Sequence, residues 1–257
     1  MNKGRPNVSD PGRVIAHRGA SRVAPENTLS AFRQAEAQGV FWVEFDVSLL
    51  GDGTPVIHHD DTLDRCTSGH GPLTAINAGD LLGIDAGVAH GGAYPDEPLA
   101  TLDQALDLLE DMRFYANLEM KTHDADPALM ARIVADALRA RPWTRHRIIT
   151  SSFELPTLAA LRQEMPDAPL AVLYEVPPPD WKARLTELGA AALHIHFTQI
   201  SQSLLTEAAS FGFDVRVYTI NHPELMEHFR EHGLTSVITD HPPLFLEQEG
   251  WAAWAET

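Results

Sequence analysis

The chain has 257 residues and is acidic, with 36 Asp and Glu against 19 Lys and Arg and a formal charge of −17. This charge argues against non-specific binding to nucleic acid or to an anionic membrane, so an anionic substrate needs a local cluster of cationic side chains. With 44% apolar residues the chain can bury a sizeable core, and its one cysteine, Cys66, excludes an intramolecular disulfide.

Short apolar runs alternate with amphipathic stretches, which is typical of proteins built from parallel β-α-β units. Nine runs have the composition of strands: 13–17, 41–49, 55–58, 114–121, 147–151, 170–174, 192–196, 214–219 and 236–239. Helical patterns between them include 28–38, 101–112, 127–140 and 223–232. The second of these begins with a T-x-x-Q capping box, Thr101 to Gln104, and the last two have proline at their first position.

The run 55–58 is too close to the run before it for a helix to intervene. Asp52-Gly53 is a strong signal for a two-residue turn, so we expect this run to return antiparallel on the second strand. Eight strands then remain, and the sequence predicts an α/β fold, a (β/α)8 TIM barrel. We expect a single domain over 1–257, with residues 61–100 as a small insertion after the second barrel strand.

Carboxylates occupy the face of two strands that should point into the barrel. Because side chains alternate along a strand, Trp42, Glu44 and Asp46 share one face, and Glu119 shares the corresponding face of run 114–121 with Asn117 and Lys121. Isolated buried charges are very unfavourable. The acids are therefore either paired in salt bridges with Lys121 and Arg18 or bound to a metal, and an all-oxygen set favours Mg²⁺ or Ca²⁺.

Two histidines complete a cluster that suits phosphoester cleavage. His17 ends the first strand, at the rim where barrel active sites lie. If Asp52 and Gly53 are the two loop residues, Asp46 opposes His59, which then faces the carboxylates; a slip of one residue would bring His58 there instead. Two imidazoles can serve as base and acid while a divalent ion and cationic side chains neutralise the phosphoryl oxygens.

These residues lie in motifs that resemble those of the glycerophosphodiester phosphodiesterase family. In chain order the motifs are IAHRG (15–19), PENT (25–28), EFDV (44–47), VIHHDDTL (56–63), NLEMK (117–121), SSF (151–153), YTIN (218–221) and ITD (238–240). The resemblance spans roughly residues 13–245, and the chain is most similar to the cytoplasmic bacterial members.

The resemblance implies hydrolysis of glycerophosphodiesters, such as glycerophosphocholine or glycerophosphoethanolamine, to sn-glycerol 3-phosphate and an alcohol. It implies His17 as general base and His59 as general acid. It implies a divalent ion, Mg²⁺ or Ca²⁺, on Glu44, Asp46 and Glu119, and phosphate contacts from Arg18 and Lys121. Tyr218 stands where many relatives have tryptophan, so an aromatic wall of the substrate pocket is kept.

Other residues and functions leave alternatives. Asn27 is expected to cap the first helix, with Glu26 steadying the His17–Arg18 rim. His194 and His196 share an inward face and either line the pocket or belong to the core. The competing functions are a lysophospholipase-D-like activity on the same barrel and a non-catalytic glycerophosphoryl-binding protein.

The composition also bears on location and partners. No apolar run approaches the ~18 residues of a membrane span, and the first fifteen residues lack the apolar segment of a secretory signal. We therefore expect a cytoplasmic protein with a small-molecule substrate, without nucleic acid or stable membrane association. This expectation leaves room for a homo-oligomer.

Overall fold

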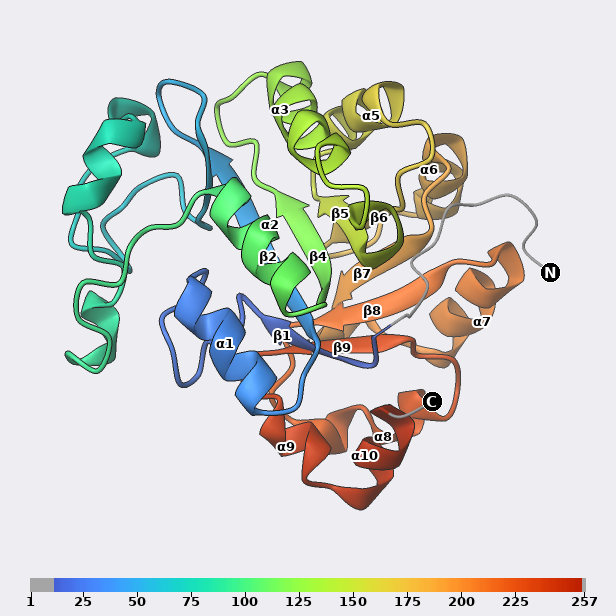
Figure 1. The fold of residues 1–257 in the computed structure, drawn as a ribbon. Coiled ribbons are helices and arrows are strands. Elements are labelled where there is room, and N and C mark those ends of the chain that lie inside the picture. The colour runs from blue at the N-terminus through green and yellow to red at the C-terminus, as the bar shows by residue number, and fades with distance from the viewer. Residues whose placement is uncertain (1–11, 256–257) are drawn as a thin grey trace.

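The computed structural model describes residues 12–255 (Figure 1). The predicted absence of a secretory signal concerns the first fifteen residues, most of which lie outside the described range. The predicted domain limits, residues 1 and 257, also lie outside it.

Eight parallel strands close into a barrel, which confirms the predicted fold. The barrel strands are β1 (Val14–His17), β2 (Trp42–Leu49), β4 (Tyr115–Met120), β5 (Ile148–Ser152), β6 (Leu170–Tyr174), β7 (Ala192–His196), β8 (Asp214–Tyr218) and β9 (Ser236–Thr239). Neighbouring strands pair in this order, and β1 pairs in parallel with both β9 and β2, which closes the sheet. All eight strands therefore end at one rim, where the loops that follow them meet.

Helices surround this barrel (Figure 1). They are α1 (Leu29–Ala37), α2 (Leu102–Asp111), α3 (Pro127–Arg139), α4 (Thr144–Arg147), α5 (Leu155–Glu164), α6 (Trp181–Leu188), α7 (Gln202–Phe211), α8 (Glu227–Arg230), α9 (Pro243–Leu246) and α10 (Glu249–Ala255). The predicted capping box of α2 is present, with Thr101 Oγ1 accepting from the Gln104 backbone N–H. Pro127 begins α3 directly after the Asp126 cap, also as predicted.

The predicted helix 223–232 is divided, which corrects the expectation of one continuous helix. A 3₁₀ turn, η5 (Pro223–Leu225), is followed by Met226 and then by the short helix α8. Met226, with φ −107° and ψ −5°, separates the two pieces, and its backbone N–H donates to Pro223 O, the i+3 to i bond of a 3₁₀ turn.

A hairpin strand, β3 (Pro55–Ile57), returns antiparallel on the end of β2 as predicted, but its register differs from the prediction. Val47 pairs with Ile57, so the loop holds the three residues Gly51, Asp52 and Gly53 rather than two. Gly53 has φ +83°, as the third position of a three-residue hairpin loop requires. Asp46 therefore opposes His58, whose backbone N–H donates to Asp46 O, and the predicted pairing of Asp46 with His59 is wrong.

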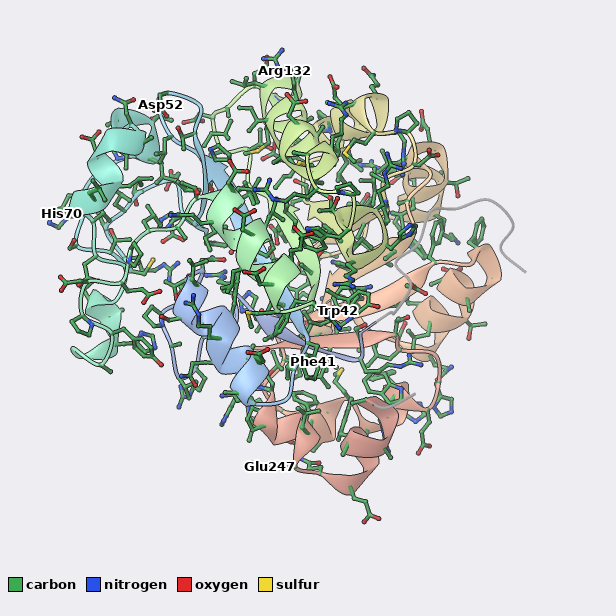
Figure 2. All side chains as sticks on the ribbon, in the orientation of Figure 1. Phe41, Trp42, Asp52, His70, Arg132 and Glu247 are labelled. Carbon is green, nitrogen blue, oxygen red and sulfur yellow. The ribbon has the colours of Figure 1, made fainter. Side chains whose placement is uncertain are left out.

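The main core lies between the barrel and the helices. Val43, Phe45 and Val47 of β2 belong to this core, which confirms their predicted outward direction. Trp42 points the other way, joins a smaller apolar cluster and stacks on Tyr115 with ring centroids 5.2 Å apart. Phe41 and Trp42, labelled in Figure 2, are neighbours in the chain but differ in exposed fraction, 54% against 3%.

The segment between β3 and α2 packs against the β2–β3 hairpin around a small second core. It contains the 3₁₀ turns η1 (Leu73–Ala75), η2 (Ala78–Gly83) and η3 (Val88–His90). Six buried side chains form its cluster: Leu50, Val56, Leu63, Leu73, Leu81 and Leu99. Figure 1 shows the segment in teal on the outside of the barrel, beside α1 and α2.

Candidate active site

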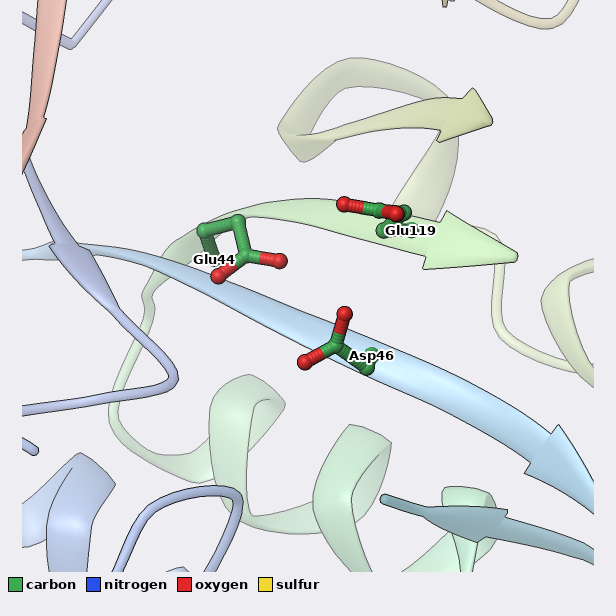
Figure 3. Close-up of side chains that lie close together, drawn as sticks. All are labelled: Glu44, Asp46 and Glu119. Carbon is green, nitrogen blue, oxygen red and sulfur yellow. The ribbon is translucent and has the colours of Figure 1, made fainter. Parts of the chain in front are cut away.

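Three buried carboxylates from adjacent barrel strands converge on one point (Figure 3). Glu44 and Asp46 lie on β2, and Glu119 of β4 stands beside Asp46 in the parallel register. One ligand oxygen from each side chain lies within 4.8 Å of the other two. The exposed fractions of the three residues are 3%, 1% and 6%, so the alternation of β2 and β4 places these acids inside the barrel as the sequence predicted.

Two cationic side chains contact the carboxylates. Arg18 Nε lies 3.2 Å from Asp46 Oδ2, and Lys121 Nζ lies 3.4 Å from Asp46 Oδ1 while forming a close ion pair with Glu119. Burial opposes ionisation of Asp46, but Lys121 and Arg18 outweigh it and hold the pKa of Asp46 below its usual range. The salt bridges considered as an alternative to a metal are therefore present, although they do not satisfy all three acids.

For Glu44 and Glu119 these cations do not outweigh the cost of burying a negative charge. Burial, followed by the charges of Asp46 and Glu119, raises the pKa of Glu44 well above its ordinary value. Burial also raises the pKa of Glu119 to about 7 in spite of Lys121. Glu44 Oε1 is buried without a hydrogen-bond partner among residues 12–255. Three acids, one with an orphaned oxygen, fit an oxygen-ligated divalent cation, because such an ion supplies the missing positive charge.

His17 lies at the end of β1 beside this cluster. Its Nδ1 is 2.6 Å from Asp240 Oδ1, and its Nε2 is 3.8 Å from Glu44 Oε2. Asp240 follows β9 and also accepts hydrogen bonds from Ser21 Oγ and Asn221 Nδ2. Burial opposes ionisation of Asp240, but the hydrogen bond and charge of His17 lead the effects that lower its pKa to about 2. Since the carboxylate only accepts, it fixes the proton on Nδ1 and leaves Nε2 toward the acids.

His59 faces the same site although the predicted register is wrong. β3 ends at Ile57, so His58 and His59 lie beyond the strand, where alternation no longer determines direction. His58 is 2% exposed, and its Nε2 is 2.9 Å from Thr62 O. The pKa of His59 is lowered by burial, and the charges acting on it are those of Asp46, Lys121 and Arg18. Of His58 and His59, it is therefore His59 that interacts electrostatically with Asp46 of the cluster, and its Nδ1 lies 2.6 Å from Asp60 Oδ1.

Asn27 has a different role from the predicted one. The cap of α1 is Thr28, whose side chain accepts from the Ala31 backbone N–H. Asn27 has φ +54°, and its side chain contacts Asp46 twice: Nδ2 donates to Asp46 Oδ2 at 2.8 Å, and Oδ1 accepts from the Asp46 backbone N–H at 3.1 Å. Asn27 therefore orients a carboxylate of the cluster. Glu26 accepts from Arg18 Nη1 at 2.6 Å, in agreement with the predicted support of the rim.

An aromatic group lies at the rim formed by β5, β7 and β8. The Tyr218 ring is 5.9 Å from that of Phe153 and 6.1 Å from that of His196, in edge-on geometry. Lys121 Nζ lies 5.4 Å from the Phe153 ring centroid. His196 thus lies at the rim beside Tyr218. His194 is fully buried, and burial followed by the charge of Arg216 lowers its pKa.

The chain is similar to known proteins over most of its length. Residues 17–244 match the model of the glycerophosphoryl diester phosphodiesterase family. The chain belongs to this family. A curated glycerophosphodiester phosphodiesterase of Caldanaerobacter subterraneus is 31% identical over 233 residues, which cover 89% of this chain and 94% of the relative. Membership confirms the resemblance seen in the sequence and the class of enzyme, a phosphoric diester hydrolase, so the non-catalytic alternative is set aside.

Solved structures of family members are similar over nearly the whole chain. A phosphodiesterase of Oleispira antarctica, in complex with the product sn-glycerol-3-phosphate, is 31% identical with a TM-score of 0.85, covering 95% of this chain and 97% of that one. A glycerophosphodiester phosphodiesterase of Agrobacterium tumefaciens is 26% identical with a TM-score of 0.80, covering 92% and 100%. Within residues 12–255, none of the helices combines the length and hydropathy needed to cross a membrane.

Some residues of the site were not singled out in the sequence. Asn221 and Asp240 lie in the motifs YTIN (218–221) and ITD (238–240). No pattern in the residues around Asp240 indicated that it would bind His17, 223 positions away. Asp60 is adjacent to His59, and only the folded geometry shows its carboxylate on the imidazole.

Proposed function

We propose that this phosphodiesterase cleaves small glycerophosphodiesters, such as glycerophosphocholine or glycerophosphoethanolamine, to sn-glycerol 3-phosphate and an alcohol. The observation that carries the proposal is the pairing of two histidines with one carboxylate cluster. His17 Nε2 lies 3.8 Å from Glu44, and Asp46 acts electrostatically on His59. The product bound in the Oleispira antarctica relative supports the same reaction.

The metal site of the proposal consists of Glu44, Asp46 and Glu119, and the ion is Mg²⁺ or Ca²⁺. These ligands offer only oxygen, which suits both ions. When bound, the ion supplies positive charge to the phosphoryl group and thereby stabilises the negative charge that builds up during substitution at phosphorus. Arg18 and Lys121 add positive charge beside the acids, where each contacts Asp46 within 3.4 Å, and we assign them to the phosphate oxygens.

The two histidines divide the proton transfers. His17, with Nδ1–H directed to Asp240, takes the proton of the attacking hydroxyl on Nε2, whether that hydroxyl belongs to water or to the neighbouring glycerol carbon. The new P–O bond forms as the bond to the alcohol breaks. Where the glycerol hydroxyl attacks, the product of this step is a cyclic phosphate, which a water then opens to glycerol 3-phosphate. His59, with Nδ1–H directed to Asp60, gives the Nε2 proton to the departing alkoxide. Tyr218 forms the aromatic wall against which the glycerol portion binds.

The direct test is release of glycerol 3-phosphate from glycerophosphocholine and glycerophosphoethanolamine. We expect turnover with added Mg²⁺ or Ca²⁺, loss of turnover with chelator and recovery on adding the ion back. His17→Ala and His59→Ala should each lower kcat by about 10²-fold or more. Full activity after complete metal removal would overturn the metal assignment, and unchanged kcat in either variant would overturn that histidine's role.

A lysophospholipase-D-like activity is the second candidate, and exposed apolar residues at the rim favour it. Phe153 and Val176, in the loops that follow β5 and β6, are 42% and 64% exposed. An acyl chain would find apolar contacts there. Side-by-side turnover of lysophosphatidylcholine and glycerophosphocholine decides between the two, because faster turnover of the lysolipid replaces our proposal. The cytoplasmic location and any homo-oligomer stay predictions from the sequence.

A further inference from the structure

We propose that Arg65, in the segment between β3 and α2, is a positioning residue that holds His59 and Arg18 in their working places by bridging the carboxylates of Asp60 and Glu26. The proposal rests on the proposed function, in which His59 is the acid and Arg18 binds the phosphate. It assigns a part in the reaction to a side chain that lies outside the barrel strands.

The guanidinium of Arg65 makes four hydrogen bonds to the two carboxylates. Nε and Nη2 donate to Asp60 at 2.6 and 3.1 Å, while Nη1 and Nη2 donate to Glu26 at 2.7 Å each. Each carboxylate is thus gripped through both oxygens. Paired contacts of this kind fix the orientation of a planar guanidinium and carboxylate as well as their distance.

Beyond each carboxylate lies a group of the active site. Asp60 Oδ1, which accepts from Arg65, is also 2.6 Å from His59 Nδ1. Glu26 Oε1, which accepts from Arg65, also accepts from Arg18 Nη1 at 2.6 Å. Arg18 Nε in turn lies 3.2 Å from Asp46. A single guanidinium therefore joins the acid, which follows β3, to the phosphate-binding side chain, which follows β1.

The electrostatics of the two carboxylates agree with this arrangement. Burial opposes ionisation of Glu26, yet the hydrogen bond from Arg65 is the foremost of the effects that lower its pKa to about 2. Burial likewise opposes ionisation of Asp60, and the hydrogen bond from Arg65 again leads the effects that lower its pKa. Removing Arg65 would leave two anions facing each other without the cation between them, and both would turn away from their present positions.

The local fold holds the backbone of Arg65 in place. Leu63 is 1% exposed and belongs to the apolar cluster of this segment, and the Cys66 side chain is also buried. Thr67 Oγ1 donates to Leu63 O at 2.7 Å, and Leu63 N donates to Gly71 O at 2.9 Å. Arg65 therefore extends from a turn that is fixed on both sides, so the segment provides a rigid support for the bridge.

The test compares two substrates that differ in their need for an acid. The choline of glycerophosphocholine leaves as a basic alkoxide and needs protonation, whereas p-nitrophenol leaves a glycerophospho-p-nitrophenyl ester without it. For Arg65→Met we expect kcat with glycerophosphocholine to fall by ~10- to 100-fold, because a small displacement of the acid has this effect. With the nitrophenyl ester we expect a change of less than about threefold in kcat and a raised KM from the displaced Arg18.

A matched control is Arg139→Met. Arg139 also bridges two carboxylates, Asp136 and Glu164, and its side chain is 43% exposed against 47% for Arg65, but it lies on α3 away from the site. We expect no selectivity between substrates in this variant. Should Arg65→Met fail to fold, Arg65→Lys carries the same test, since lysine keeps the charge without the paired geometry and should show a smaller loss of the same selectivity.

Outcomes separate this proposal from the proposed function. Equal losses on both substrates, or no loss, in the Arg65 variant overturn the positioning role. His59→Ala is measured beside it. If His59→Ala discriminates between the substrates and the Arg65 variant does not, only the Arg65 inference fails; if His59→Ala shows no discrimination, the acid role of His59 fails as well.

Discussion

Asp240 binds the imidazole of His17 at 2.6 Å across 223 positions of sequence, joining the last barrel strand to the first. The carboxylate also receives hydrogen bonds from Ser21 and Asn221, so its own orientation is fixed. Because β1 and β9 are neighbours in the closed barrel, closure of the sheet is what brings Asp240 to His17. The base of the proposed reaction therefore depends on correct closure.

Asp240→Asn tests this relationship. An amide can present its N–H to Nδ1 and thereby shift the imidazole proton to Nε2, where the base must be free, so we expect kcat for glycerophosphocholine to fall by about 10²-fold or more. The measurement is steady-state turnover with Mg²⁺ present. Asp64→Asn is the matched control, because Asp64 pairs with the exposed His70 at 3.2 Å, and its kcat should not change. Equal rates for wild type and Asp240→Asn would contradict the role of Asp240.

His58→Ala and His59→Ala should differ in kind. His58 is buried and its ring contacts the Thr62 backbone, so its loss should lower the free energy of unfolding by about 2 kcal/mol while kcat changes little. His59 is the proposed acid, so its loss should lower kcat without a comparable loss of stability. Urea unfolding and turnover on the same preparations check both. A normal rate for His59→Ala beside an inactive, folded His58→Ala would reverse the assignment.

Metal affinity should rise with pH between about pH 6 and about pH 8. Burial raises the pKa of Glu119 to about 7 in the metal-free protein and also raises that of Glu44. Below these pKa values the carboxyls carry protons that the ion must displace. Each fall of one pH unit therefore weakens metal binding about tenfold per displaced proton. Calorimetric titration with Mg²⁺ at about pH 6 and about pH 8 measures this. The same affinity at both values would contradict the account, and Glu119→Gln should show weaker binding with a smaller pH dependence.

Asn27→Gly tests the contact that replaced the predicted helix cap. Glycine accepts the φ of +54°, so the substitution removes the two hydrogen bonds to Asp46 without adding strain. We expect a loss of about 2 kcal/mol in the free energy of unfolding together with weaker metal binding. Thr28→Ala, which removes the true cap of α1, should cost about 1 kcal/mol and leave metal affinity unchanged. Equal metal affinity in both variants would contradict the role of Asn27.

Periodicity was enough to predict the barrel and its acids, because it depends on burial alone. Outward Val43, Phe45 and Val47 left Glu44 and Asp46 with one possible direction once β2 was a barrel strand. The same reasoning failed for the hairpin, where a two- and a three-residue loop both use Asp52-Gly53. His59 nonetheless faces the carboxylates because it lies past the end of β3, where the loop and not the pleat orients it.

Hydrogen-bond partners were the part that local sequence could not supply. Asparagine is a common helix cap, yet Asn27 has a positive φ and its side chain contacts Asp46, so Thr28 is the cap of α1. The bridge from Arg65 to Glu26 spans 39 positions and depends on how the segment after β3 folds against the loop after β1. Such contacts follow from tertiary geometry, and no periodic pattern in the chain reports them.

The central claim is that a divalent ion among Glu44, Asp46 and Glu119 makes the reaction possible. Turnover of glycerophosphocholine by protein stripped of metal, before and after addition of Mg²⁺ or Ca²⁺, tests it most directly. We predict loss of glycerol 3-phosphate release on stripping and recovery on adding the ion. Undiminished release from protein whose metal content has been measured as negligible would contradict the account.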